Sequence, residues 1–127
     1  MYQIFFYRDT RGTYPVHEFI GELNKKSRAG AYRTIRLLLR YGPNLLRPYA
    51  DHVRGKIREL RIKTADGNIR IFYFFFIEGR IILLHAFKKK SQELPEREIE
   101  HAIRCMNDAV QRYEDGEYVF TEEDICQ

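Results

Sequence analysis

At 127 residues, 44% of them hydrophobic and 14% aromatic, the chain has the size and composition of one folded domain and not of a disordered protein. Its longest apolar run, residues 71–77, is too short to cross a bilayer, and the N-terminal sequence lacks the features of a secretory signal. We therefore expect a cytoplasmic protein with no membrane partner. Cys105 and Cys126 lack metal-ligand spacing, which argues against a zinc site and against a disulfide framework.

The net charge of +4 conceals a segregation of charge along the chain. Residues 1–90 hold 19 basic and 7 acidic residues, a balance of +12, whereas residues 91–127 hold 3 basic and 11 acidic residues, a balance of −8. A body this positive is expected to bind a polyanion. Tyrosines and strand-like segments alternate with the basic residues, which favours nucleic acid over a membrane surface. A basic surface that serves only solubility is the alternative.

The first part of the chain is predicted to form one strand and two antiparallel helices. Residues 2–7 are few, aromatic and extended in character, as in a strand. Apolar residues then recur at helical spacing over residues 16–23 and again over residues 31–39. Ser27 is the expected N-cap of the second helix, and Gly42 is its expected stop.

The middle of the chain is predicted to be a three-stranded antiparallel meander over residues 56–64, 69–77 and 80–88. Two-residue turns are expected at residues 66–67 and 78–79, where Asp-Gly and Glu-Gly separate segments rich in strand-forming residues. Apolar residues occupy both alternations of the second and third strands, so helices must cover both faces of the sheet.

Two segments flank this meander. Residues 43–55 hold two prolines and no clear periodicity, so we expect a loop, which carries Arg47, Tyr49, His52 and Arg54. A final amphipathic helix is predicted from Pro95 to Tyr113. We accordingly divide the chain into a folded domain over residues 1–113 and an acidic C-terminal tail over residues 114–127.

The two turns determine the strand register, which in turn predicts a site. With two-residue turns, Phe72 lies opposite both Arg61 and His85, while Lys63 lies opposite Arg70. Side chains two residues apart share one face of a strand, so the cations of neighbouring rows are expected to meet at one end of one face. These cations are Arg61, Lys63, Arg70, His85 and Lys89.

The other face of the meander is predicted to be the core side, covered by the first two helices. Its members are Leu60, Ile62, Ile71, Tyr73, Phe75, Ile82 and Leu84. The basic face is expected to become apolar toward its far end, through Phe74, Phe76, Ile81 and Leu83. The cations could instead pair with acids of the last helix or of the tail, and the tail could itself lie across the basic face or remain solvated.

The residue types on the basic face suit phosphodiester chemistry. The sequence has no HExxH, no P-loop, and no paired carboxylates or Ser/His/Asp arrangement for glycosyl or acyl transfer. Cleavage of RNA without a metal or cofactor needs one group to take the proton of the 2′-hydroxyl, one to protonate the leaving 5′-oxygen, and cations to hold the developing charge. His85 and Lys89 are the candidates for proton transfer, although a purely structural role for His85 is equally open.

Three segments together resemble the RelE/ParE superfamily of toxins, and within it the phage-derived HigB-like branch. They are residues 56–61, which end in Glu-Leu-Arg, residues 67–74, which contain Arg-Ile-Phe-Tyr, and residues 80–90, which contain Leu-His-Ala-Phe-Lys-Lys-Lys. Pro95 then opens a glutamate-rich helix. The resemblance spans residues 2–113 and leaves residues 114–127 outside.

The resemblance implies an α/β (α+β) protein with a RelE-like microbial RNase toxin fold: an antiparallel sheet, two N-terminal helices on one face, and a C-terminal helix. It also implies a ribosome-dependent mRNA endonuclease, acting on mRNA in the ribosomal A site, that is neutralised by a cognate antitoxin of the helix-turn-helix type. The basic residues that match those of the family are Arg61, Arg70 and the run of lysines at residues 88–90. With the register argument, the predicted catalytic residues are Arg61, Arg70, Lys89 and His85. The predicted RNA-binding residues are Lys56, Lys63, Lys88, Lys90 and Arg54.

Two other functions remain open from the sequence. A ParE-like protein would inhibit DNA gyrase by binding it, without catalysis, and a prophage relative could have lost toxicity and bind only its antitoxin. Relatives that use a tyrosine or histidine near the end of the chain differ from this sequence, whose end is acidic. His85 is the nearest substitute for such a residue.

Overall fold

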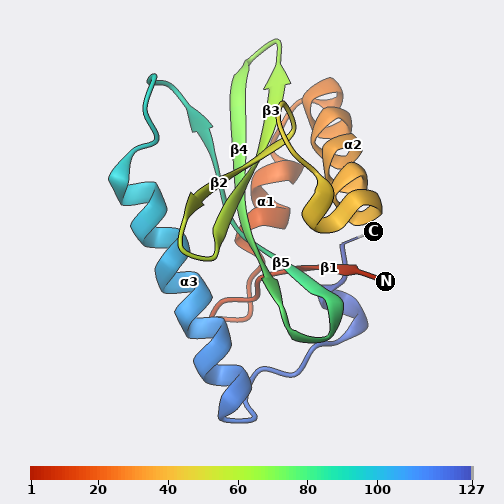
Figure 1. Cartoon of the computed structure of the whole chain (residues 1–127), viewed down its shortest axis with the longest axis vertical. Coiled ribbons are helices and arrows are strands. Elements are labelled where there is room, and N and C mark those ends of the chain that lie inside the picture. Colours follow the sequence, from red (N-terminus) through yellow and green to blue (C-terminus); the bar gives the residue numbers. More distant parts are fainter. Residues whose placement is uncertain (127) are drawn as a thin grey trace.

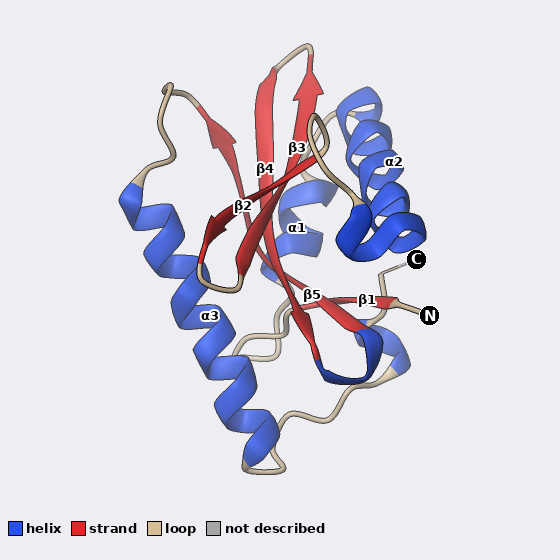
Figure 2. Ribbon diagram, viewed as in Figure 1, coloured by secondary structure: helices blue, strands red, loops and turns tan. Residues whose placement is uncertain are grey.

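The computed structural model describes residues 1–126 as a five-stranded sheet with α-helices on both faces (Figure 1, Figure 2). The strand order is β1-β5-β4-β3-β2, in which β1 is parallel to β5 and the other neighbours are antiparallel. This arrangement confirms the predicted α+β class and the placement of the helices. The elements are β1 (Gln3–Phe6), α1 (Pro15–Gly21), α2 (Lys25–Tyr41), β2 (Ala50–Arg54), β3 (Ile57–Thr64), β4 (Gly67–Phe76), β5 (Arg80–Lys89) and α3 (Glu96–Glu114).

The ends of α2 follow from two local interactions. Asn24, and not the predicted Ser27, is the N-cap: the Asn24 side chain accepts a hydrogen bond of 2.8 Å from the Ser27 amide. Gly42 ends the helix as predicted, with φ at 53°. A Cβ atom at Gly42 would also lie 2.7 Å from the ring of Tyr2. The positive φ and this close contact each disfavour a larger residue at this position.

The predicted loop over residues 43–55 is wrong in its second half, which forms β2. This strand is short, lies at the sheet edge and contains mainly polar residues, so it has no alternating apolar pattern to reveal it. Pairing with β3 defines it instead, from Ala50 opposite Leu60 to Arg54 opposite Ile57. The pairing ends where the Arg61 amide donates to the Tyr49 carbonyl at 2.8 Å.

Two apolar cores lie on opposite faces of the sheet. Helices α1 and α2 cover one face and α3 covers the other (Figure 2). The first core joins Val16, Ile20 and Leu38 to Leu60, Ile71, Tyr73, Ile81 and Leu83. The second joins Ile99, Ala102 and Ala109 to Ile57, Phe72, Phe74, Ile82 and Leu84. Both faces are therefore covered, as the doubly apolar strands predicted.

The turn between β3 and β4 corrects the predicted register. Thr64 pairs with Gly67, so the turn is Ala65-Asp66 rather than Asp66-Gly67. Every pair between these strands is thus displaced by two residues, and Arg61 lies opposite Arg70 instead of Phe72. A displacement of two leaves each side chain on its predicted face, because the side-chain period of a strand is two.

A bulge in β5 corrects the predicted faces of that strand. His85 lies opposite Phe72 as predicted, but the register shifts at the next pair, where Leu83 faces Tyr73. The cause is a three-residue turn, Ile77–Gly79, in which Glu78 has a φ of 59°. Because of the extra residue, Ile82 and Leu84 face α3. Ile81 and Leu83 face α1 and α2. The prediction had placed each of these two pairs on the opposite face.

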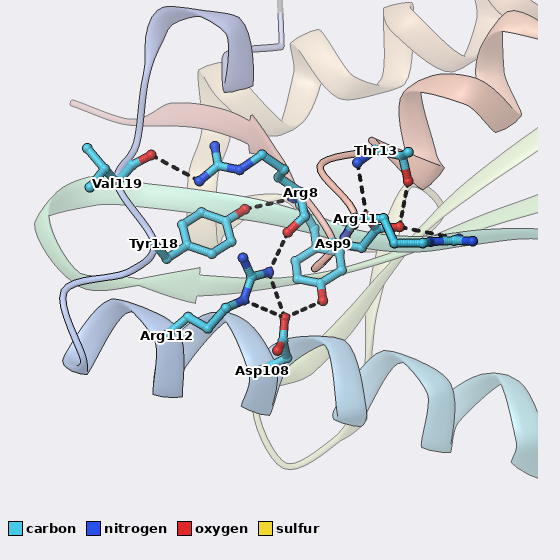
Figure 3. A network of polar contacts seen from close by, with 9 residues as sticks. Arg8, Asp9, Arg11, Thr13, Asp108, Arg112, Tyr118 and Val119 are labelled. Carbon is cyan, nitrogen blue, oxygen red and sulfur yellow. Dashed lines mark hydrogen bonds and ion pairs between the residues drawn. The ribbon is translucent and has the colours of Figure 1, made fainter.

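Residues 117–126 pack against β1 and the loop after it, and the two ends of the chain lie side by side (Figure 1). The Tyr118 hydroxyl accepts a hydrogen bond of 2.8 Å from the Arg8 amide (Figure 3). The buried carboxylate of Asp124 accepts hydrogen bonds of 2.6 Å from both Arg8 and Tyr14. Strand β1 pairs with residues 80–83 of β5, at the end away from His85 and Lys89, so this acidic segment packs on the fold and does not lie across the basic face.

Asp124→Ala is expected to lower the free energy of unfolding by about 2–4 kcal/mol, because it leaves Arg8 and Tyr14 without their shared acceptor. Urea denaturation of the variant measures the change. Glu122→Ala, an exposed neighbour on the same turn, is the matched control and should unfold like the wild type. Equal stability of all three proteins would contradict a structural role for the segment.

Candidate nucleic-acid site

Nine side chains of β3, β4 and β5 form three rows on the face that α3 covers. Each row joins residues that lie opposite one another on neighbouring strands. Because side chains alternate along a strand, all three rows lie on the same face as Ile57, Phe72 and Phe87, which pack with α3. All four predicted catalytic residues therefore share one face. The rows are Glu59-Phe72-His85, Arg61-Arg70-Phe87 and Lys63-Asn68-Lys89.

A buried carboxylate separates the two arginines. Glu59 Oε1 lies 3.1 Å from Nε of Arg70, and Glu59 Oε2 lies 4.0 Å from Nε of Arg61. The Arg70–Glu59 contact is an ion pair without a well-directed hydrogen bond, so Oε1 and Nε have no hydrogen-bond partner within residues 1–126. Such a charged pair offsets the repulsion between the directly opposed arginines.

Burial dominates the electrostatics of this pair. Desolvation raises the pKa of Glu59 above its ordinary value, against the opposing effect of Arg70 and Arg61. Desolvation likewise lowers the pKa of Arg70. Arg61 is more accessible, with 32% of its side chain exposed, against 6% for Arg70. A ligand that approaches this face therefore meets Arg61 first.

His85 lies at the other end of the Glu59 row, on the α3 side. Its Nε2 atom lies 2.9 Å from Oε1 of Glu98, which belongs to the first turn of α3. The ring stacks on Phe87 at 5.7 Å and lies 4.4 Å from the ring of His101. Burial, and then the nearby His85, lowers the pKa of His101. Glu98 thus fixes the orientation of an imidazole that is only 17% exposed.

Lys89 holds the loop that joins β5 to α3. Its amine donates to the backbone carbonyls of Ser91 and Gln92. An open hollow of about 1120 Å³ lies beside this loop and is lined by residues that include Phe87, Lys88, Lys90 and Arg97. These contacts engage two of the three donors of the Lys89 amine in holding this loop at the rim of the basic face.

The predicted RNA-binding residues are dispersed around the rows. Lys63 lies on the basic face and Lys90 lies just beyond it, and both are exposed. Lys88 points to the opposite face, because it alternates with Phe87 and Lys89. Lys56 lies in the turn between β2 and β3, beside Phe74 and Met106. Arg54, at the end of β2, pairs with Glu96 in the first turn of α3.

Sequence reasoning missed the two carboxylates of the site. Glu59 stands in the Glu-Leu-Arg motif two residues before Arg61, so strand alternation alone could have placed it beside the arginine. Glu98 could not be paired with His85 in this way, because the packing of α3 on the sheet sets that contact. Within residues 1–126, no group of three His, Cys, Asp or Glu residues is arranged to hold a metal ion.

Glu96→Gln is expected to raise the affinity for single-stranded RNA about two- to fivefold at low salt, because it frees Arg54 for phosphate. The gain should disappear at high salt, since both groups are exposed and screened. Fluorescence anisotropy with a labelled oligoribonucleotide measures it. Glu114→Gln makes the same change of net charge at the far end of α3, and an equal gain there would contradict the interpretation.

Residues 18–107 match the family described as Phage derived protein Gp49-like (DUF891). The chain belongs to the Gp49-like family. The match extends from α1 to α3 and contains every residue of the three rows. This family is toxin-like, of the RelE/HigB type, and its toxin-antitoxin character suggests an antitoxin partner. No curated protein matches the chain.

Over residues 1–126 of this Gp49-like protein, no helix is both long and apolar enough to cross a bilayer.

Proposed function

We propose that this Gp49-like protein is the toxin of a toxin-antitoxin pair and cleaves mRNA in the ribosomal A site without a metal ion. The observation that carries the proposal is the arrangement of one carboxylate, two guanidinium groups and one imidazole on adjacent strands of one face. These four groups are the complement that RNA transesterification requires: a base, a phosphate-binding pair and an acid.

Each group has a distinct role in the proposed reaction. Glu59 accepts the proton of the ribose 2′-hydroxyl, and the 2′-oxygen attacks the adjoining phosphorus. Arg61 and Arg70 bind the phosphate oxygens and stabilise the extra negative charge of the transition state. The bond from phosphorus to the 5′-oxygen then breaks, and His85 gives its proton to that oxygen. The products are a 2′,3′-cyclic phosphate and a 5′-hydroxyl.

The environment of each group supports this division of roles. Because burial raises the pKa of Glu59, its carboxylate accepts a proton more readily than an exposed one. The contact of Nε2 with Glu98 holds the imidazole of His85 in a fixed orientation. The amine of Lys89 is engaged with two carbonyls, so we assign Lys89 to loop positioning and leave the proton transfers to Glu59 and His85.

The test is brief induction of the protein in growing bacteria, followed by mapping of new 5′ ends in all mRNAs. We expect growth arrest together with new in-frame cuts confined to translated regions. Arg61→Ala should abolish both, while Lys25→Ala, an exposed cation on α2, should abolish neither. Growth arrest without new cuts would contradict the proposal and would direct attention to gyrase.

A cognate antitoxin is the proposed protein partner. Co-expression of the neighbouring gene product should relieve the arrest and should yield a stable complex with this chain. A complex that forms equally well with the Arg61→Ala protein would place antitoxin binding outside the catalytic rows.

A further inference from the structure

A second basic feature adjoins the catalytic rows at Arg61 and Lys63 and lies between β3 and α2. Figure 1 shows the position of these two elements. Two open hollows of about 330 and 510 Å³ share Gly30, Arg33 and Lys63 in their walls, so they adjoin each other, and we name them together the α2–β3 groove. Leu37 and Ile62 give part of its lining an apolar character. Of the residues that line it, the proposed function uses only Arg61.

The charge of the α2–β3 groove is entirely positive. Lys26, Arg33, Arg61 and Lys63 line it, and none of the residues that line the two hollows is acidic. Over residues 1–126, Arg33 and Lys63 are exposed and make no ion pair. Helix α2 as a whole carries six basic residues and no acidic one. Arg61 has Glu59 as its counter-charge, whereas Arg33 and Lys63 remain available to attract an anionic partner.

The groove also has an aromatic wall and a connection to the catalytic face. Tyr49 lines it with 45% of its surface exposed, next to the point where β2 stops pairing with β3. Arg61 lines the same groove and lies 4.0 Å from Glu59. Arg61 thus belongs both to the lining of the groove and to the proposed phosphate site, so the two sites adjoin each other and a strand bound at one can continue into the other.

We propose that the α2–β3 groove binds the part of the RNA strand adjacent to the scissile phosphate. Arg33 and Lys63 contact its phosphates, and one base stacks on Tyr49. Proteins that hold single strands combine a cationic channel for the backbone with aromatic faces for the bases, and this groove has both. The assignment rests on the proposed function for its location next to a cleavage site, although the binding itself does not require catalysis.

Gly30 provides a way to close the groove without changing its charge. A Cβ atom at this position would meet only the end of the Arg33 side chain, at 3.8 Å, so the helix accepts a larger residue there. Gly30→Phe should therefore block the groove while it leaves the fold and the cations in place. Arg36→Ala is the matched control, because Arg36 is an exposed cation of α2 that does not line the groove.

The experiment measures binding of a labelled, mixed-sequence single-stranded RNA whose 2′-O-methyl groups prevent cleavage. Tyr49→Ala should weaken binding about 5- to 100-fold, as expected for the loss of one stacked base. Gly30→Phe should weaken it to a similar extent, and Arg33→Ala should reduce the slope of log affinity against log salt by about 0.7. Arg36→Ala should change affinity less than twofold.

Other outcomes separate this inference from the proposed function. RNA binding that is unchanged in Tyr49→Ala and Gly30→Phe overturns it. Loss of binding to polyglutamate in these variants, with RNA binding retained, also overturns it and assigns the groove to an acidic polypeptide. If the wild type binds the RNA through the groove but cuts no mRNA in cells, the groove assignment stands and the proposed nuclease fails.

Discussion

Arg61→Ala is expected to lower the rate of mRNA cleavage by a factor of about 10² to 10³, the usual effect of removing one group that stabilises transition-state charge. Arg61 is the accessible arginine of the site, with 32% of its side chain exposed, so its truncation should leave the fold intact. Cleavage of a reporter mRNA in a translation extract measures the loss, and circular dichroism verifies the fold.

Arg61→Lys tests whether charge or geometry is required. Lysine retains the charge but presents no planar pair of donors to a phosphate, so we expect only partial recovery. Arg36→Ala, which removes an exposed cation of α2, should cleave like the wild type. Cleavage by Arg61→Ala at more than a third of the wild-type rate would refute the assigned role.

Arg70→Ala is expected to lower the free energy of unfolding by about 3–5 kcal/mol, because it leaves the buried carboxylate of Glu59 without its nearest cation. The loss is large because neither side chain is more than 8% exposed. Replacing both partners, as in Glu59→Leu with Arg70→Met, should restore most of the stability while abolishing cleavage. Equilibrium denaturation of the wild type, Glu59→Leu, Arg70→Met and the double variant measures the coupling.

The pH dependence of stability provides a separate check on Glu59. A carboxyl whose pKa is raised in the folded chain takes up its proton at a higher pH than the unfolded chain does. Stability should therefore fall as the pH rises above the ordinary range of glutamate, through the folded pKa of Glu59. Glu59→Gln should remove this part of the profile. If the profile is unchanged, Glu59 does not titrate as the burial of its carboxyl indicates.

The sequence was sufficient to predict most of the sheet and its helices, because their periodic patterns are long. It failed where tertiary contacts decide the structure. Strand β2 is polar, and its pairing with β3 is what defines it. The bulge at Leu84 accompanies a turn of three residues, Ile77–Gly79, where the sequence predicted a turn of two. Both faces of β5 are apolar, so its sequence pattern could not show which residues face α3 and which face α1 and α2.

The site was predictable in part for a simple geometric reason. The error in the first turn displaced β4 by two residues against β3, and a displacement by two preserves every face. Arg61, Arg70 and His85 consequently share the predicted face in spite of the wrong pairs. The same alternation along β3 would have placed Glu59 on the face of Arg61. The contact of Glu98 with His85 depends on how α3 packs on the sheet, and the periodicity of the sequence does not show that packing.

The attachment of residues 117–126 to β1 has a consequence for how the sheet avoids association with other chains. An edge strand offers unpaired amides and carbonyls to any neighbouring polypeptide. Here the Cys126 amide donates to the Ile4 carbonyl at 2.8 Å, and Ile125 bridges Phe5, so the chain closes its own edge. The ribosome adds residues 125 and 126 long after Ile4 and Phe5, the residues of β1 with which they pair. The edge of β1 therefore stays unpaired until residues 125 and 126 have been synthesised.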